Sequence, residues 1–486
     1  MIQLTNNQKD ALQKLQAFSK EPKARCFVLR GYAGTGKTTL VGHYVEWLES
    51  NGFEVELLAT TGRAAKVLAN KTGREAATIH SCVYVFDEMA EQLPKGEQSG
   101  QLTLQFGIRD RPICDKPVVY IVDEASMIAN TASKGGQLAN FGTGHLLRDF
   151  LDFTEGERIV FVGDPCQLPP VSEDSFSPAL SPRYMRDHYH VAVRYAELFE
   201  IVRQSINSEI LYLAGIFRND IVQEKYVQWP KLSVPREESA HLIKNEHLLV
   251  AKYLDFLKRR DYDKAVMIVN ANRHCRRLNH KIRMTLFNNK KLQKGELLMV
   301  VQNNYLVPLS NGDQVVVESV RPHGKKAGFF FLEVEVKSIA NGAKYKTLLI
   351  RDLLFNDFAG LQADESRRLL IDFDQRARKK GLKRKSEAYR DAMRSDPYLN
   401  ALRAKFGYVI TCHKSQGGEW KHVFLNIQKG VYAQTSNALY RWFYTALTRA
   451  SEQLYINDGF WVKGFAKRQP RVNAAFFKNR NKKRGK

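Results

Sequence analysis

The residues best suited to chemistry form a phosphate-binding loop near the start of the chain. Residues 31–38 read Gly-Tyr-Ala-Gly-Thr-Gly-Lys-Thr, which fits the pattern GxxxxGK[ST] in full. Glycines let backbone N–H groups approach phosphate oxygens, and a helix N-terminus adds positive potential there. Lys37 can reach the β- and γ-phosphates of a nucleotide, and the hydroxyl of Thr38 can ligate Mg²⁺. The loop follows the apolar run Cys26–Leu29 and opens a helical pattern, which is the context that the motif requires.

Two later segments carry groups that could act on a bound phosphate. Asp123 and Glu124 follow the apolar run Val118–Val122. One carboxylate there can hold the Mg²⁺ shell while its neighbour activates the attacking water. Gln167, in the turn Gly163–Pro170, could sense the γ-phosphate or position water.

Hydrolysis also needs positive charge beside the transferred phosphate. Arg203, in Leu198–Gln204, and Arg449, in Tyr444–Ala450, are the two candidates. Because the chain holds 75 Lys and Arg residues, a single arginine is identified only by the motif around it.

These groups are expected at the ends of parallel strands. In the first 205 residues, short apolar runs alternate with helical patterns, which predicts a parallel α/β sheet. The clearest helix places five apolar residues on one face: Leu40, Val41, Tyr44, Val45 and Leu48. Strand-like runs that predict a second α/β unit lie at Ala265–Val269, Tyr408–Thr411, Val423–Ile427 and Leu454–Asn457.

Two insertions interrupt this pattern. Residues 81–113 are expected to form a β-hairpin on the first unit. Residues 295–405 begin β-rich, with Asn311-Gly312 and Asn341-Gly342 as hairpin turns, and predict a small barrel. The back of this insertion is helical, with an apolar face of Leu369, Leu370, Phe373 and Ala377. Its basic run, residues 376–385, is either a solvated helix end or an arm that contacts phosphates.

The charge balance predicts a polyanionic partner. The formal net charge is +24, and nucleic acid is the usual partner of so basic a protein. Residues 463–486 carry ten Lys or Arg and no acid, which is typical of disordered tails that bind polyanions nonspecifically.

Other features exclude some classes of protein. No run of 18 apolar residues suggests a membrane span, and the first residues do not resemble a secretory signal. The six cysteines form no CxxC pair, which argues against a zinc site or a disulfide framework and favours the cytoplasm. They are Cys26, Cys82, Cys114, Cys166, Cys275 and Cys412.

Taken together, the motifs resemble those of superfamily 1 DNA helicases of the 5′→3′ group, most closely the RecD-like and phage Dda-like branch. They follow the family's order from the adenine-reading glutamine, Gln8, through motifs I (31–38), Ia (59–65), Ib (77–81), II (123–124), III (163–170), IV (around Arg203), V (411–419) and VI (442–450). The likeness spans about residues 5–457 and departs in the helical half of the second insertion and in the basic tail.

The resemblance implies two RecA-like P-loop NTPase domains with parallel sheets and ATP in the cleft between them. The first would cover residues 1–205, with a strand-separating hairpin at 81–113. The second would cover 206–462, interrupted at 295–405 by an SH3-like β-barrel and a basic helical arm, and followed by the tail 463–486.

The same resemblance assigns residues to the nucleotide site. Catalytic roles are expected for Lys37, Asp123, Glu124, Gln167, Arg203 and Arg449, and Mg²⁺ ligation for Thr38 and Asp123. Nucleotide contacts are expected from Gln8, Gly31, Ala33, Gly34, Thr35, Gly36, Lys37, Thr38, Thr39 and Glu419.

On the nucleic-acid side, hydroxyls, amides and rings are expected to grip a single strand. The candidates are Thr60, Thr61, Arg63, Thr78, His80, Asn272, Thr411 and His413. In the hairpin, Phe106 or Tyr84 would either stack on a base or pack inside the hairpin.

The function that follows is ATP-dependent unwinding of DNA, 5′→3′, by a monomer acting on single-stranded and forked DNA. Single-strand-binding or replication proteins are further candidate partners. The alternatives are translocation or protein displacement with little unwinding, RNA as the track, and a non-motor P-loop enzyme.

Overall fold

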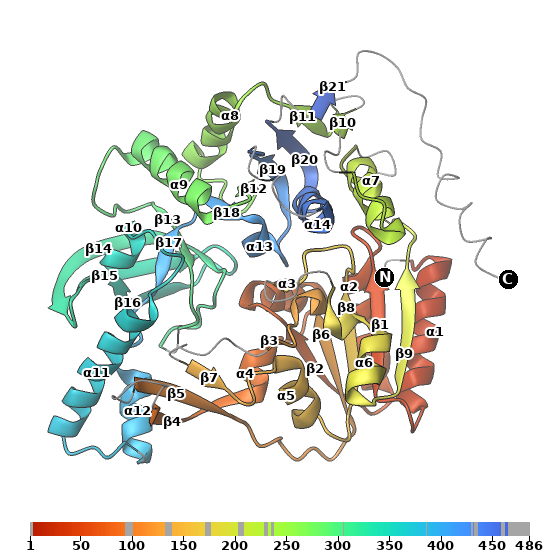
Figure 1. The fold of residues 1–486 in the computed structure, drawn as a ribbon, viewed down its shortest axis with the longest axis horizontal. Helices are drawn as coiled ribbons and strands as arrows, with labels where there is room; N and C mark the ends of the chain where they lie inside the picture. The colour runs from red at the N-terminus through yellow and green to blue at the C-terminus, as the bar shows by residue number, and fades with distance from the viewer. Residues whose placement is uncertain are drawn as a thin grey trace.

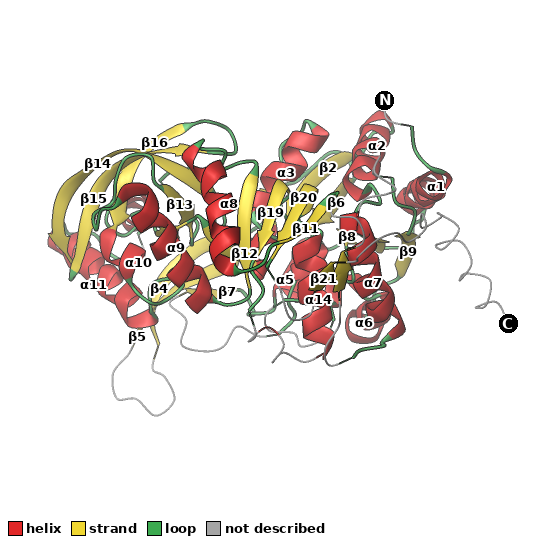
Figure 2. Cartoon of the chain, turned by 90° about the horizontal axis from the view of Figure 1, so that it is seen from above, coloured by secondary structure: helices red, strands yellow, loops and turns green. Residues whose placement is uncertain are grey.

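The computed structural model describes residues 3–92, 101–131, 139–170, 176–202, 209–227, 232–234, 238–304, 306–384, 386–428, 431, 436–457 and 462–464. Figures 1 and 2 show two parallel sheets and, beside them, an antiparallel sheet and a hairpin. No helix in the described ranges is long and apolar enough to cross a bilayer.

The first sheet is entirely parallel, as predicted, and has the order β3-β2-β6-β8-β1-β9. Its strands are β1 (Cys26–Gly31), β2 (Glu54–Ala59), β3 (Ala77–Thr78), β6 (Val118–Asp123), β8 (Arg158–Gly163) and β9 (Val193–Leu198). The central strands are apolar at consecutive positions because helices cover both faces. Phe27 and Leu29 point to one face, whereas Cys26 and Val28 point to the other.

Helices α1 (Asn6–Lys20), α2 (Lys37–Ser50) and α3 (Gly62–Thr72) bury their apolar stripes on the first of these faces. The predicted face of α2 is buried throughout, from Leu40 to Leu48. The other face is covered by α4 (Ile79–Val83), α5 (Leu146–Phe153) and α6 (Pro182–Tyr189), with short 3₁₀ turns at Ala125–Met127 and Pro178–Leu180.

The second sheet is also parallel, with the order β11-β20-β19-β12-β18. Its strands are β11 (Ala240–Leu242), β12 (Ala265–Val269), β18 (Val409–Thr411), β19 (Trp420–Leu425) and β20 (Ala450–Ile456). Helices α7 (Glu209–Gln223) and α14 (Ser436–Leu447) pack on one face, and α8 (Glu246–Lys258) and α9 (Asn272–Phe287) on the other. The four strands predicted from apolar runs are all present.

The hairpin insertion forms as predicted, from β4 (Tyr84–Gln92) and β5 (Gln101–Ile108). A third strand, β7 (Ala139–Phe141), pairs with β5 in parallel. The sequence did not indicate β7, because three residues are too few to show a period. The hairpin's tip, residues 93–100, lies outside the described residues.

The second insertion contains an antiparallel sheet with the order β16-β15-β14-β13-β17. Its strands are β13 (Leu297–Val300), β14 (Gln314–Lys326), β15 (Phe329–Ser338), β16 (Lys344–Ile350) and β17 (Ala404–Phe406). The sheet curls so that the Leu402 N–H donates to Leu348 O at 2.6 Å and the Ile350 N–H to Leu402 O at 3.2 Å. These bonds join its two edges, in keeping with the barrel expected from the sequence.

One turn prediction in this insertion was wrong. Asn341-Gly342 does lie in the short loop between β15 and β16, but Asn311-Gly312 is not a hairpin turn. The whole segment 301–313, called here the 301–313 loop, joins β13 to β14. Its end turns tightly, with the Asp313 N–H donating to Ser310 O at 3.0 Å, and this end contacts α3 through the Lys66–Asp313 pair.

The helical part of the insertion comprises α10 (Arg351–Phe355), α11 (Ala363–Lys379) and α12 (Glu387–Ser395), and the predicted apolar face of α11 is buried. Two arginines of the basic run have structural partners. Arg376 pairs with Asp396 and Asp372, and Arg384 pairs with Asp374 at 2.6 Å.

The remaining basic side chains of this run that the structure describes are exposed: Arg378, Lys379, Lys380 and Lys383. The run is therefore partly a packed helix end, and among its described residues only these exposed positions are open to a phosphate.

Two further features connect the parts. The strand β17 runs into β18 through only Gly407 and Tyr408, so the insertion ends almost directly in the second sheet. The short β10 (Leu232–Val234) pairs with β21 (Val462–Gly464). The first residues of the predicted tail, Lys463 and Gly464, are therefore part of a strand; residues 465–486 lie outside the described residues.

Candidate functional site

The phosphate-binding loop is wound tightly around its lysine. Helix α2 begins at Lys37, after Gly34 and Gly36, whose φ values of 79° and 74° favour glycine. The ammonium of Lys37 donates to Gly31 O at 2.7 Å and to Tyr32 O at 3.2 Å. A Cβ on Gly31 would lie 2.7 Å from Lys37 Cγ. The loop therefore has the glycines and the helix start that a phosphate group needs.

The acidic pair ends β6 in a strained conformation. Glu124 has φ = 52°, and its N–H donates to Asp123 Oδ1 at 2.8 Å. Such a conformation in a non-glycine residue costs free energy and is concentrated at functional sites. Burial raises the pKa of both carboxyls, and the positive charge of Lys37 opposes this rise. The structure thus brings the predicted carboxylates and the loop lysine into one electrostatic site.

A tyrosine from α14 connects this site to the second sheet. The Ala33 N–H of the phosphate loop donates to Tyr444 Oη at 2.9 Å, and the Tyr444 hydroxyl donates to Asp164 Oδ2 at 2.6 Å. The neighbouring Thr445 Oγ1 accepts from the Leu168 N–H at 2.9 Å. Helix α14 therefore touches both the phosphate loop and the turn after β8.

Two more side chains of the second sheet hold this turn. Arg441 donates to Gln167 O at 3.1 Å, and Gln416 donates to Leu168 O at 2.9 Å. Sequence reasoning missed Arg441, Tyr444 and Gln416 as site residues. The signal was present in α14, where Arg441, Tyr444 and Thr445 lie at the spacing of one helix face, with Thr448 directly after the helix.

Gln167 itself is 3% exposed, and its Oε1 has no hydrogen-bond partner among the described residues. Buried polar atoms are nearly always bonded, so this oxygen is suited to accept from a water or ligand. That arrangement agrees with the predicted role in positioning water.

Arg449 also lies within this site. Its guanidinium donates to Gly418 O and Thr445 O, each at 3.0 Å, and its charge opposes the raised pKa of Glu124. Arg203 lies outside the described residues. Its neighbour Val202 donates its N–H to Gly34 O at 2.9 Å, so the chain reaches the phosphate loop at that point.

Gln8 supports the phosphate loop from behind. Its Nε2 donates to Thr35 O at 3.0 Å, and its Oε1 accepts from the Thr5 N–H at 3.0 Å in a capping box of α1. Both ends of the amide are thus engaged, and adenine reading by Gln8 stays a prediction. Glu419 is exposed just before β19, where the predicted ribose contact also remains untested.

The residues present fit a nucleotide with Mg²⁺. Thr38 and Thr39 are half-buried at the start of α2. The positive charge of Lys37 acts on the Asp123 carboxyl and opposes the rise of its pKa. No cluster of three or more metal-binding His, Cys, Asp or Glu residues occurs in the described ranges. A site with one carboxylate and one hydroxyl suits Mg²⁺, which is commonly completed by phosphates and waters.

The candidate strand contacts lie at the carboxyl ends of parallel strands in both sheets. Thr60 and Thr61 follow β2, Thr78 ends β3, Asn272 follows β12, and Thr411 ends β18. Three of these hydroxyls have local partners: Thr61 and Thr78 cap α3 and α4, and Thr60 Oγ1 lies 3.4 Å from Glu124 O. Asn272 is exposed at the start of α9, and Thr411 is buried.

The two predicted histidines differ in environment. His80 has an exposed edge, while the rings of Tyr84 and Phe141 crowd its other side with centroids 5.8 Å away. His413 is half-buried in α13 (Cys412–Ser415). Desolvation lowers the pKa of both imidazoles, which favours their neutral forms.

Arg63 is placed at the junction of the two sheets. Its guanidinium lies over the Trp420 ring, 4.0 Å from the centroid, and burial lowers its pKa to about 10. A Cβ added to Gly418 would lie 3.0 Å from Arg63 Nε. Arg63 therefore packs against the second sheet, and its predicted contact with a strand is untested.

The 301–313 loop contacts α3 as well. Lys66 and Asp313 form an ion pair at 2.6 Å, and a Cβ on Gly62 would lie 2.1 Å from Ser310 Cβ. Helix α3 is thus enclosed by the second sheet and the insertion, a contact that the sequence did not predict.

In the hairpin, the structure favours packing for both aromatic candidates. Tyr84 is 5% and Phe106 8% exposed. The Tyr84 hydroxyl donates to Asp149 at 2.7 Å, and the Phe106 ring stacks on Phe141 at 4.6 Å.

Two family models match the chain. Residues 3–226 match the AAA domain family, and residues 406–457 match the UvrD-like helicase C-terminal domain. The second match includes motifs V and VI, and the first includes the phosphate loop and the acidic pair.

Individual relatives agree with these matches. The ATP-dependent RecD2 DNA helicase of Deinococcus radiodurans is 24% identical over 437 residues, 89% of this chain and 46% of that protein. The ATP-dependent DNA helicase dda of Enterobacteria phage T4 is 30% identical over 217 residues, 44% of this chain and 43% of that protein. The chain thus spans less than half of either relative. A Pif1 helicase from Bacteroides, solved with ADP-AlF3 and ssDNA, aligns over 95% of this chain and 94% of its own at 16% identity, with a TM-score of 0.48.

Proposed function

The chain belongs to superfamily 1 of the helicases, in the branch of the RecD-like and Dda-like proteins, and we propose that it is an ATP-driven motor. In this proposal it moves along single-stranded DNA in the 5′→3′ direction and unwinds duplex ahead of it. Both relatives named above are described as ATP-dependent DNA helicases.

The observation that carries the proposal is the composite nucleotide site. Tyr444 binds Ala33 and Asp164 together, so one helix of the second sheet bonds to two loops of the first. A nucleotide held at the phosphate loop would therefore be sensed by both sheets. That arrangement supports a motor over a P-loop enzyme whose site lies within a single unit.

The proposed chemistry assigns one task to each residue. Lys37 and the α2 N-terminus hold the phosphates, and Thr38 and Asp123 would hold Mg²⁺. The metal, when bound, supplies a positive charge that offsets the negative charge developing on the phosphates. Glu124 accepts a proton from the attacking water, and Gln167 orients that water through its unpaired Oε1. Arg449 adds positive charge from the second sheet.

Movement follows from the same contacts in this proposal. Nucleotide binding strengthens the bonds across the cleft, and hydrolysis releases them. The candidate strand contacts lie on both sheets, so an opening and closing cleft would shift one set along the strand relative to the other.

The experiment that tests the proposal compares duplexes with a 5′ tail, with a 3′ tail and with blunt ends, in ATP and Mg²⁺. Separation of the 5′-tailed duplex alone is expected, and Lys37→Met should abolish it. Separation of only the 3′-tailed duplex would overturn the polarity. Strand-stimulated ATP hydrolysis without separation would favour single-strand translocation, and a parallel series on RNA tails tests the track.

A further inference from the structure

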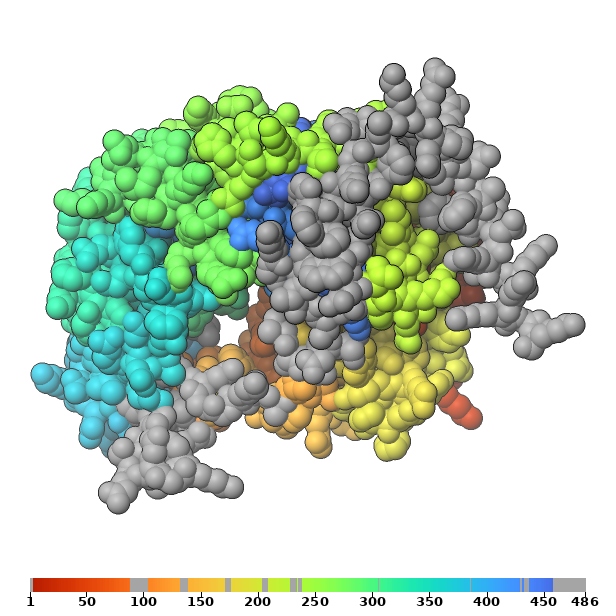
Figure 3. Space-filling model, turned by 45° about the horizontal axis from the view of Figure 1, so that its top comes forward, coloured from red at the N-terminus to blue at the C-terminus, as the bar shows by residue number. Residues whose placement is uncertain are grey.

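A cavity of about 830 Å³ lies between the hairpin and the second insertion. One wall comes from α4, β4, β5 and β7, and the other from the start of the 301–313 loop, from α11 and α12, and from the segment before β17. Its volume falls within the range of about 300–1,000 Å³ that is usual for small-ligand sites. Figure 3 shows that the surface is hollowed between the cyan insertion and the brown-to-orange elements of the first sheet.

The hairpin wall is aromatic. It includes the rings of His80, Tyr84, Phe86, Phe106 and Phe141. Phe86 meets Phe106 edge to face at 5.6 Å, and Phe106 stacks on Phe141 at 4.6 Å, so the rings support one another. The ring nitrogens of His80 have no hydrogen-bond partner within the described part of the chain. Tyr84, Phe86 and Phe106 are largely buried in this wall, so the rings that it presents to an occupant are those of His80, which is exposed, and Phe141, which is half-buried.

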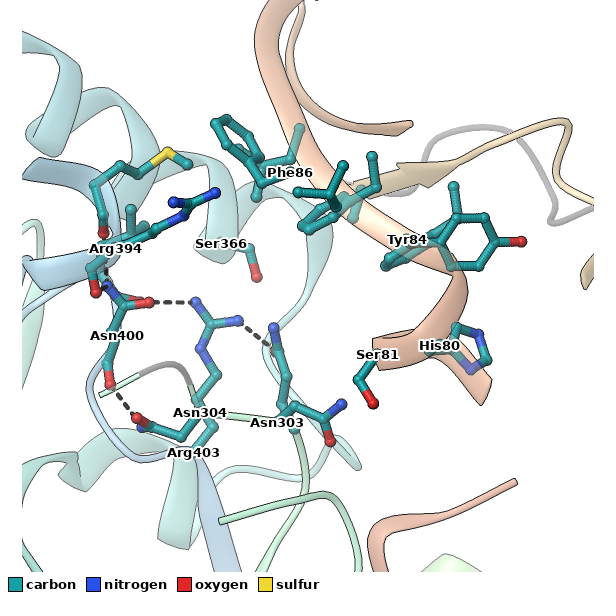
Figure 4. A pocket seen from close by; sticks show the side chains of 18 of the residues that line it. His80, Ser81, Tyr84, Phe86, Asn303, Asn304, Ser366, Arg394, Asn400 and Arg403 are labelled. Carbon is teal, nitrogen blue, oxygen red and sulfur yellow. Dashed lines mark hydrogen bonds between the residues drawn. The ribbon is translucent and has the colours of Figure 1, made fainter. Parts of the chain in front are cut away.

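The opposite wall carries amides and guanidinium groups. Asn303, Asn304, Asn400 and Arg403 lie across the space from Tyr84 and His80 in Figure 4. Asn304 donates to Asn400 O at 2.7 Å and accepts from the Leu306 N–H at 2.8 Å, which fixes this corner. The amide nitrogen of Asn303 has no hydrogen-bond partner among the residues that the structure describes. None of the described lining residues is an Asp or Glu, although three are Arg.

Ser366 supplies an independent sign that a ligand is expected here. The residue is only 5% exposed, and its hydroxyl has no hydrogen-bond partner in the described ranges. Figure 4 shows this hydroxyl pointing into the space between Phe86 and Arg403. Nearly buried hydroxyls are normally bonded, so this one is ready for a polar atom of an occupant.

We propose that this cavity binds an unpaired nucleobase of the DNA strand, stacked on the hairpin's rings and hydrogen-bonded by the opposite wall. A base has a π-face for the first wall, and edges that both donate and accept for Asn303 and Ser366. The Arg403 guanidinium, held by Gln302 and by Leu399 O, adds positive charge to this wall. The absence of acids among the described lining residues suits the attached phosphates. An apolar ligand would leave the Asn303 amide nitrogen and the Ser366 hydroxyl unpaired, and a free phosphate would leave the rings without a partner.

The location of the cavity supports the same occupant. His80 lines it, and Thr78 and His80 are predicted strand contacts at the end of β3. The inference rests on the proposed function, because the base belongs to the strand on which the motor would move. A bound base would add a contact between the hairpin and the insertion, which already share a hydrophobic cluster that includes Phe86 and Met393, together with the long Arg390–Asp87 pair at 3.9 Å.

The test fills the cavity from its rim. Ala363 is exposed at the start of α11 and lines the cavity, so Ala363→Trp adds an indole there at little cost to the fold. The matched control is Asp364→Trp, since Asp364 is the next residue, has a 91% exposed side chain and does not line the cavity. Each protein is titrated with a single-stranded oligodeoxynucleotide carrying one abasic residue at each position in turn.

For the unaltered protein, loss of the base at one or two adjacent positions should weaken binding about fivefold or more, the lower limit for a base stacked on an aromatic ring. Ala363→Trp should bind the intact strand more weakly, and its affinity should not depend on the position of the abasic residue. Asp364→Trp should keep the loss of affinity at the same one or two positions as the unaltered protein. Normal strand binding with a flat scan in the unaltered protein would overturn this inference alone. Failure to bind any strand would overturn the proposed function and this inference with it.

Discussion

The hydroxyl of Tyr444, on a helix of the second sheet, donates a 2.6 Å hydrogen bond to Asp164, at the end of a strand of the first. The same oxygen accepts from the Ala33 N–H of the phosphate loop. A single buried side chain thus ties the nucleotide site of the first sheet to a helix of the second.

Tyr444→Phe should slow strand-stimulated ATP hydrolysis with little change in the KM for ATP. The substitution removes the hydroxyl that bonds Asp164 and Ala33, at a cost of about 1–3 kcal/mol. If this cost raises the barrier to hydrolysis, kcat falls about 5- to 150-fold. Steady-state ATPase assays measure it. The matched control is Tyr440→Phe on the same helix, whose hydroxyl accepts instead from the Val227 N–H at 3.0 Å. Equal effects of the two changes would contradict a specific role for Tyr444.

Arg449→Ala should abolish most hydrolysis while ATP still binds. Positive charge of this kind contributes about 10³–10⁵ in rate to phosphoryl transfer, whereas the phosphate loop holds the nucleotide without it. Single-turnover hydrolysis and equilibrium binding of a fluorescent ATP analogue separate the two effects. Arg378→Ala, on the exposed face of α11, serves as the control. Near-normal turnover in Arg449→Ala would mean that the second sheet does not complete the site.

Gly62→Ala should weaken the contact between α3 and the 301–313 loop, because the new Cβ would lie 2.1 Å from Ser310 Cβ. Overpacking of this kind costs about 1–3 kcal/mol, measurable as a lower midpoint of urea unfolding. The second change Ser310→Gly removes the clashing atoms and should restore the midpoint. Gly42→Ala on α2, where a Cβ meets nothing within 4 Å, should be neutral or stabilising. Absence of rescue by Ser310→Gly would show that the clash is not the cause.

Stability should fall in acid through Glu246. Hydrogen bonds from Arg277, first of all, and from Asn426 hold the pKa of this carboxyl down at about 2. Its folded pKa is depressed, so its stabilisation is present above the unfolded pKa of about 4.3 and is lost as pH falls towards 2. Thermal midpoints of Glu246→Gln and the unaltered protein should differ at pH 7 and converge near pH 2. Asp10→Asn, which breaks the exposed pair with Lys14, should show little difference at either pH.

Affinity for single-stranded DNA should fall steeply with salt. Each phosphate neutralised adds about 0.7 to the slope of log K against log salt concentration. With a net charge of +24, a slope of several units is expected from titrations between low and physiological salt. A slope near zero would remove the electrostatic argument for a nucleic-acid partner.

The sequence predicted the parts of the fold whose pattern is local. Strands such as Ala265–Val269 were found from apolar runs that helices cover on both faces, and the phosphate loop from its glycines. Contacts between distant segments could not be read in this way. No pattern in the sequence assigned a role to Tyr444 itself, and only the packing of α14 on the first sheet turns its hydroxyl towards Ala33 and Asp164.

The turn prediction at Asn311-Gly312 failed for a similar reason. That dipeptide favours a tight hairpin locally, but the 301–313 loop is long because Ser310 and Asp313 contact α3. The cavity beside the hairpin was equally hidden, since its walls come from residues such as Ser81 and Asn400 that lie far apart in the chain.

The near-continuity of β17 and β18 limits how the insertion can behave. Only Gly407 and Tyr408 separate the two strands; a Cβ on Gly407 would lie 3.0 Å from Leu298 C, and the Tyr408 hydroxyl accepts from the Leu297 N–H at 3.2 Å. There is no hinge at this point. The insertion should therefore move with the second sheet as one rigid body. Any rotation of that sheet would then also move the cavity wall that faces the hairpin.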